Sequence, residues 1–176
     1  MKWTASGFEL PQVSVNLSVK QLERPEFVET LQAILEETGI EPGRLKLEIT
    51  ESVVMAVDDA FTLLDRLRKI GISLALDDFG TGYSSLSYLK MLPVQQLKID
   101  RSFVIGIGQN PEDEAIIRSV MALAQSLNFE VVAEGVETAE QAAFLSASGC
   151  HQLQGFLHGS AVAPAEFRAR WSSLPR

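Results

Sequence analysis

The 176-residue chain contains one cysteine and two histidines. Cys150 alone cannot form an internal disulfide, and a zinc site usually needs four nitrogen or sulfur ligands in a close pattern. His151 and His158 lie near this cysteine, and we assign them structural or incidental roles. No serine–histidine arrangement around a nucleophile elbow is present. These absences disfavour a disulfide scaffold, a zinc enzyme and a serine hydrolase.

Long apolar runs are also missing. No stretch approaches the roughly 20 residues of a membrane span, and no signal peptide opens the chain, so we expect a cytoplasmic protein without membrane contact from this segment. Basic residues are outnumbered, with 15 Lys and Arg against 23 Asp and Glu and a formal net charge of -8. This balance argues against binding a nucleic-acid polymer. It still permits an anionic small ligand whose phosphates are met by metal ions.

The remaining composition is typical of a soluble globular protein, with 46% hydrophobic and 22% charged residues. No linker, low-complexity tract or shift in composition divides the chain. We therefore predict one continuous domain over residues 1–176, long enough to bury a sizeable core.

Strand and helix patterns alternate along the whole chain, which predicts an α/β fold with a parallel sheet. Such spacing suits a (β/α)₈ barrel or a doubly wound sheet. The absence of G-x-G-x-x-G after the first strand favours the barrel. The expected strands are Val13–Leu17, Leu45–Thr50, Ser73–Phe79, Gln96–Asp100, Glu130–Val136 and Gln152–Phe156. The expected helices are Pro25–Thr38, Asp58–Ile70, Ser84–Lys90, Pro111–Leu127, Thr138–Ser148 and Pro164–Trp171.

Two adjacent acids, Asp77 and Asp78, end the apolar run Ile72–Leu76 and precede a glycine-rich turn. Taken alone, the pair fits either a divalent-cation site or the start of a helix, where negative charge is favourable. Polar residues at the ends of the other strands favour the cation site, because the carboxyl ends of parallel strands meet at one edge. These residues are Asn16, Glu48, Thr50, Lys98, Asp100, Glu134 and Gln154.

Carboxylates, one amide and one lysine make an oxygen-rich site of Mg²⁺ or Mn²⁺ character. With two metal ions, such a site suits hydrolysis of a phosphodiester by an in-line water, which Lys98 could orient. Two other acidic features are set aside. Asp58 and Asp59 open a predicted helix, and Glu114 lies inside another.

Together these residues form a series of short motifs that resembles the EAL-domain family of cyclic di-GMP phosphodiesterases, from about Trp3 to near Phe167. The matching segments are Val15-Asn16-Leu17-Ser18, Leu47-Glu48-Ile49-Thr50-Glu51-Ser52, Asp77-Asp78-Phe79-Gly80-Thr81-Gly82-Tyr83-Ser84-Ser85-Leu86, Leu97-Lys98-Ile99-Asp100, Val132-Ala133-Glu134-Gly135-Val136-Glu137 and Gln154-Gly155-Phe156-Leu157.

The resemblance implies a TIM-type (β/α)8 barrel and Mg²⁺- or Mn²⁺-dependent hydrolysis of cyclic di-GMP to pGpG. It implies that the metal ligands are Asn16, Glu48, Asp77 and Asp78, with Asp77 bridging two ions. By the same resemblance, Lys98 holds the attacking water, and Glu134 is a general base or metal partner. Residues that support the loop or line the ligand pocket would be Glu51, Glu137 and Gln154. For Glu51 and Glu137, capping of a helix start stays an alternative.

The chain departs from the family in two ways. Its Glu-Ala-Leu signature strand is absent, so we expect an incomplete barrel of about six strand-helix units that lacks the first two strands and one metal ligand. Near the end, Phe156 and His158–Ala161 replace the usual Tyr and the basic residue with its proline. Two exposed sheet edges would favour a homodimer. The alternative function is a catalytically inactive EAL-like module that binds a nucleotide or a protein.

Overall fold

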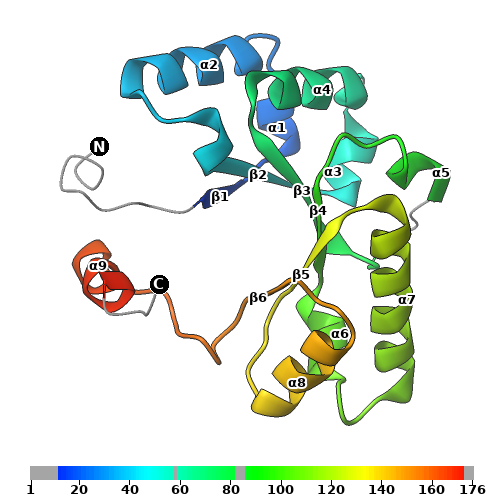
Figure 1. Cartoon of the computed structure of the whole chain (residues 1–176). Helices are drawn as coiled ribbons and strands as arrows, with labels where there is room; N and C mark the ends of the chain where they lie inside the picture. The colour runs from blue at the N-terminus through cyan, green and yellow to red at the C-terminus, as the bar shows by residue number, and fades with distance from the viewer. Residues whose placement is uncertain (1–11, 58, 82–85, 173–176) are drawn as a thin grey trace.

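A computed structural model describes residues 12–57, 59–81 and 86–172. Its six strands form one parallel sheet in the order β1-β2-β3-β4-β5-β6. The strands are β1 (Val13–Asn16), β2 (Leu45–Thr50), β3 (Ser73–Phe79), β4 (Gln96–Ile99), β5 (Glu130–Ala133) and β6 (Gln152–Leu153). Each strand lies beside the strand that follows it in the sequence, whereas in a doubly wound sheet the order of the strands reverses. The predicted incomplete barrel is confirmed as a curled half-barrel (Figure 1).

Side chains alternate between the two faces of each strand, and the two faces differ in polarity. On the face that packs against the helices, apolar residues are nearly fully buried, for example Ile49, Leu74 and Leu97. Burial of each such side chain stabilises the fold by about 1.5–3 kcal/mol. The opposite, concave face carries Glu48 and Lys98, which are also buried. The apolar face therefore stabilises the sheet, and the concave face can hold polar groups.

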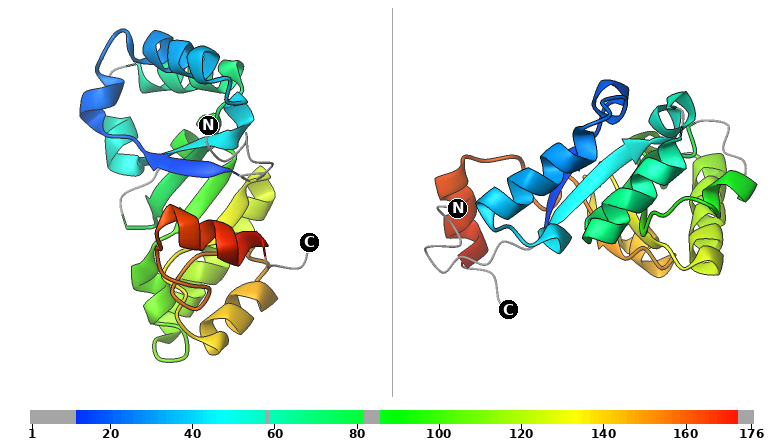
Figure 2. Two further views of the ribbon diagram at one scale, coloured as in Figure 1. Left: turned by 90° about the vertical axis from the view of Figure 1, so that its left-hand side faces the viewer. Right: turned by 90° about the horizontal axis from the view of Figure 1, so that it is seen from above.

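Most helices cover the convex side of the sheet (Figures 1 and 2). Longer helices are α2 (Phe27–Thr38), α4 (Ala60–Ile70), α7 (Pro111–Leu127), α8 (Ala139–Ala147) and α9 (Pro164–Ser172), and shorter ones are α1 (Val19–Leu22), α3 (Glu51–Ala56), α5 (Leu86–Leu89), α6 (Arg101–Ile105) and a 3-10 turn, η2 (Pro42–Arg44). In the views of Figures 1 and 2, α9 and α7 lie on opposite sides of the sheet.

The helix ends follow from local sequence. Asn110 accepts a hydrogen bond from the amide of Glu112 at 3.0 Å, and Pro111 occupies the first turn of α7. Both are favoured at helix starts. The helices α2 and α4 end where Gly39 and Gly71 adopt positive φ angles of 65° and 99°. Glycine adopts this left-handed conformation without steric cost, so these helices end where the sequence predicts.

Some predicted boundaries are wrong. The fifth strand was expected to reach Val136 but ends at Ala133, and Gly135 then turns the chain with a φ of 69°. The sixth strand ends at Leu153 rather than Phe156. The predicted helix from Asp58 instead begins at Ala60, because Asp59 has a left-handed φ of 59°. Trp3, Asp58 and Gly82–Ser85 lie outside the described residues.

Three short helices were not predicted from the sequence, and each begins within three residues of the end of a strand. Ser18 and Gln21 form a capping box at the start of α1. Thr50 Oγ1 accepts from the amide of Val53 at the start of α3, and Asp100 Oδ1 accepts from the amide of Ser102 at the start of α6. At α3 and α6 these caps satisfy the first helical amides, so the chain enters each helix with at most one residue after the strand.

Candidate active site

The ammonium group of Lys98 lies among carboxylates supplied by other strands. Its Nζ is 2.6 Å from Glu48 Oε2 on β2, 3.0 Å from Asp77 Oδ1 on β3 and 2.6 Å from Glu134 Oε1, which follows β5. Lys98 is 3% exposed, and Glu48 and Asp77 are each 8% exposed. Residues from four successive strands thus meet at the carboxyl edge of the concave face.

The electrostatics of this cluster are those of a buried, coupled group. Burial works against the charge of Lys98, but hydrogen bonds to Glu134, Glu48 and Asp77 outweigh it and raise the pKa of the lysine above its ordinary value. Burial raises the pKa of the Glu134 carboxyl, and the nearby Lys98 ammonium only partly offsets this effect. Lys98 therefore stays charged at neutral pH, and Glu134 is a better proton acceptor than an ordinary carboxylate.

Asp78 follows Asp77 with its backbone in the left-handed conformation, at a φ of 53°. Few residues other than glycine adopt this conformation, although aspartate tolerates it better than most. The amide of Asp78 donates to Asp77 Oδ1 at 3.0 Å. Partial burial, followed by the charges of Asp77 and Asp100, raises the pKa of the Asp78 carboxyl. This irregular part of β3, where the register with β4 shifts between Leu76 and Phe79, holds the two acids close together despite their mutual repulsion.

The loop after Asp78 is tied back to the sheet. Thr81 Oγ1 donates to the carbonyl of Asp78 at 2.8 Å, and the amide of Gly80 donates to Glu51 Oε1 at 3.5 Å. Gly80 has a φ of 98°, and an added Cβ would approach the Phe103 ring to 3.1 Å. Glu51, which the resemblance assigns to this loop, therefore reaches it from the first residue of α3.

The other predicted site residues lie around this cluster. Asn16 is exposed on β1 and is in register with Glu48, so it is on the same row of the sheet. Gln154 is exposed directly after β6, two strands away from Lys98 along the sheet. Their assigned roles stay predictions.

Three further predicted residues make structural contacts. As described above, Thr50 and Asp100 cap α3 and α6. Glu137 Oε1 lies 2.7 Å from Arg101 Nη2 in an ion pair whose side chains are half exposed. The amide of Glu137 also donates to Gln141 Oε1 at 2.7 Å, next to the capping box of α8.

The oxygen donors of the cluster suit a divalent cation. Carboxylate oxygens of Asp77, Asp78 and Glu134 lie within 4.8 Å of one another. Together with Glu48, four carboxylates face the single ammonium of Lys98, so negative charge is in excess. Carboxylate and amide oxygens are the ligands that hard cations such as Mg²⁺ and Mn²⁺ prefer. The side chains present therefore fit a divalent-cation site.

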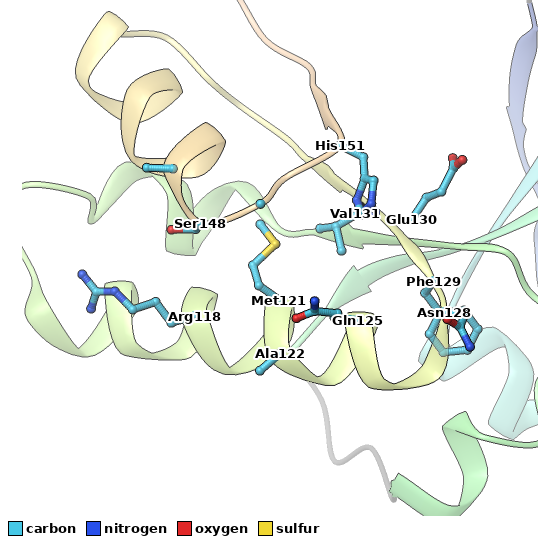
Figure 3. A pocket seen from close by; sticks show the side chains of 12 residues that line it. Arg118, Met121, Ala122, Gln125, Asn128, Phe129, Glu130, Val131, Ser148 and His151 are labelled. Atoms are coloured by element: carbon cyan, nitrogen blue, oxygen red, sulfur yellow. Dashed lines mark hydrogen bonds between the residues drawn. The ribbon is translucent and has the colours of Figure 1, made fainter.

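A separate pocket of about 660 Å³ lies at the opposite end of the sheet (Figure 3). It is lined by α7, the start of β5 and the turn that leads into β6, with Met121, Phe129 and Val131 among its apolar residues. His151 Nδ1 accepts from the amide of Val131 at 3.0 Å, which gives this histidine a structural role. The acidic cluster does not line this pocket.

A family model described as the EAL domain matches residues 1–161. The chain belongs to the EAL domain family. The resemblance of the sequence motifs is thereby confirmed.

Two relatives that are named cyclic di-GMP phosphodiesterases are similar in sequence to most of this chain. The cyclic di-GMP phosphodiesterase NbdA of Pseudomonas aeruginosa is 45% identical over 153 residues, which are 86% of this chain and 20% of NbdA. The cyclic di-GMP phosphodiesterase PdeR of Escherichia coli is 39% identical over 171 residues, 97% of this chain and 26% of PdeR. The chain thus spans about a fifth to a quarter of the length of these relatives.

Two solved structures have the same fold as this chain. The PaMucR phosphodiesterase in complex with c-di-GMP matches with a TM-score of 0.89 and 41% identity, over 94% of this chain and 68% of that one. Klebsiella pneumoniae BlrP1, solved with manganese and cyclic di-GMP at pH 9.0, matches with a TM-score of 0.76 and 37% identity, over 83% of this chain and 38% of BlrP1.

Among the described helices, none combines the length and the hydrophobicity that a bilayer crossing requires.

Proposed function

We propose that this EAL domain hydrolyses cyclic di-GMP to linear pGpG with the help of Mg²⁺ or Mn²⁺. The observation that carries the proposal is the contact of Lys98 with carboxylates on β2, on β3 and directly after β5 at 2.6–3.0 Å. The support from relatives is that NbdA and PdeR are named cyclic di-GMP phosphodiesterases and that BlrP1 was solved with manganese and the nucleotide.

Divalent cations would be held by Asp77 and Asp78, with Glu48 and Asn16 on the adjoining strands. When bound, such cations supply Lewis-acid stabilisation of the phosphoryl charge and make water a stronger nucleophile at neutral pH. Two ions, with Asp77 shared between them, are the arrangement that we propose. The acid pair near the end of β3 is suited to this role because its carboxylate oxygens lie within 4.8 Å of each other and of Glu134.

The side chains of the chain would handle the protons and the orientation of the water. Lys98 donates hydrogen bonds and can orient a water next to the phosphate, since its raised pKa keeps it charged. Glu134, with its raised pKa, can accept the proton of that water as oxygen adds to phosphorus. The bond from phosphorus to the 3′ oxygen of the ribose breaks, and that oxygen takes up a proton.

The direct test is to incubate the chain with cyclic di-GMP and either Mg²⁺ or Mn²⁺ and to separate the nucleotides by chromatography. We expect pGpG to form, a chelator to stop its formation, and Asp77→Asn to abolish it. Asp65→Asn is a matched surface control, because Asp65 forms an exposed ion pair with Lys69 on α4. Binding of the nucleotide without turnover under both metals would favour the inactive binding module instead.

We also propose that the chain forms a homodimer through its outer strands. In the part of the chain that the structure describes, β1 and β6 each pair with one neighbour only. Val13 and Val15 on β1 are 47% and 43% exposed, and Phe156 beyond β6 is 68% exposed. Unpaired edges with exposed apolar side chains recruit other strands.

Light scattering after size-exclusion chromatography tests this proposal, and Val15→Lys is expected to shift the dimer to a monomer. A monomer at every concentration would contradict it. A single domain over residues 1–176 and a cytoplasmic location stay predictions.

A further inference from the structure

Two hydrogen bonds on the concave face join side chains of β2 and β4 across the intervening strand β3. Lys98 Nζ on β4 donates to Glu48 Oε2 on β2 at 2.6 Å. Lys46 Nζ on β2 donates to Gln96 Oε1 on β4 at 2.8 Å. Since neighbouring strands are about 4.8 Å apart, β2 and β4 are separated by roughly 10 Å. Both pairs of side chains must therefore lean over β3 to meet.

Ala75 is the residue of β3 that lies beneath these crossings. Its register partners are Glu48 on β2 and Gln96 on β4, which are members of the two bonded pairs. It shares the concave face with Asp77, two residues further along the strand. Ala75 is 0% exposed although it has only a methyl side chain. We attribute this burial to the long polar side chains that cross over it.

A larger residue at position 75 would occupy the space that the crossings need. Side chains on a strand stand roughly perpendicular to the sheet, so a branched side chain here rises into the layer of Lys98 and Glu48. A packed interior accommodates added methyl groups only by moving its neighbours. Among the neighbours of position 75, Lys98 can move away most easily, because its flexible side chain can turn toward Glu134.

We propose that Ala75 is a positioning residue that keeps the space over β3 open, so that Lys98 can reach Glu48 while it contacts Asp77 and Glu134. Ala75 touches no substrate in this scheme and acts through Lys98. The expected loss of activity rests on the proposed function, whereas the expected displacement of Lys98 does not.

The test compares Ala75→Val with Ala75→Gly, which keeps the space open, and with Ala124→Val. Ala124 is also a fully buried alanine, on α7, so its replacement controls for overpacking alone. We expect Ala75→Val to lower kcat for cyclic di-GMP by about 100-fold, as for a misplacement of about 1 Å. Its KM should change by less than about 3-fold. Ala75→Gly and Ala124→Val should keep kcat within about 3-fold of the parent.

A crystal structure of Ala75→Val supplies a second readout that does not depend on activity. We expect the separation of Lys98 Nζ from Glu48 Oε2 to grow from 2.6 Å to beyond about 4 Å, the limit of an ion pair. An unchanged separation together with an unchanged kcat would overturn the inference and leave the proposed function standing. A folded parent without hydrolysis would overturn the proposed function, and the crystal structure would still decide the role of Ala75.

Discussion

Replacement of Lys98 by methionine removes the ammonium group that contacts three carboxylates and leaves the size of the side chain nearly unchanged. Lys98 Nζ contacts Glu48, Asp77 and Glu134, and its side chain is 4% exposed. Removing one partner of a buried ion pair typically costs about 3–5 kcal/mol, because the remaining charge stays buried. We therefore expect Lys98→Met to lower the free energy of unfolding at pH 7 in the absence of metal.

Protonation of one of the remaining carboxyl groups limits the loss of unfolding free energy in Lys98→Met. For a carboxyl with an ordinary pKa of 4.5, proton uptake at pH 7 costs about 3.4 kcal/mol, since each pH unit corresponds to about 1.36 kcal/mol. At pH 5 the same uptake costs less than about 1 kcal/mol. The destabilisation by Lys98→Met should thus be about 3 kcal/mol at pH 7 and should nearly vanish at pH 5.

Urea unfolding followed by circular dichroism, with a chelator present, measures both values. Lys69→Met is the matched control, because its ion pair with Asp65 is exposed and is expected to be worth only about 0.3–0.5 kcal/mol. A loss below about 1 kcal/mol at pH 7, or a loss that does not shrink at pH 5, would refute the reasoning.

Three further results are expected. Because the folded pKa of Lys98 is raised above its ordinary 10.5, its contribution to stability is fully present below about pH 10.5 and falls at higher pH. Urea midpoints of the parent should therefore decline above that pH more steeply than those of Lys98→Met. Asp78→Asn should raise the urea midpoint in the presence of a chelator, since burial and the charge of Asp77 raise the pKa of Asp78. The same variant should bind Mn²⁺ more weakly in calorimetry, and an unchanged affinity would count against Asp78 as a ligand. Gly155→Ala should destabilise the fold by about 1–3 kcal/mol or more, because the new Cβ would clash with the backbone of Val136. In the control Gly43→Ala, the new Cβ meets only an ordinary contact at 3.8 Å, so the melting temperature should change little.

Much of the fold could be predicted because the patterns are long and have clear ends. The strands Leu45–Thr50 and Ser73–Phe79 and the helix Pro111–Leu127 have the predicted bounds. The short helices α1, α3 and α6 could not be separated from the strands before them by periodicity, which needs more than four to six residues. Their cap residues, such as Ser18 and Asp100, were the available signal.

The location of the site could be predicted from the sequence, but the contacts between its side chains could not. Polar residues at successive strand ends indicate a common edge, and the structure brings Glu48, Asp77 and Glu134 together there. The contact of one lysine with all three depends on how far side chains lean across β3. That depends in turn on the small size of Ala75, which no strand-end pattern singles out.

Binding of Mn²⁺ in the absence of nucleotide tests the central claim most directly, because it asks whether these side chains form a cation site. Titration followed by electron paramagnetic resonance should show Mn²⁺ bound by the parent chain and an affinity at least about tenfold lower for the folded Asp77→Asn variant. Equal affinity for both proteins, or no binding by a folded parent, would contradict the account.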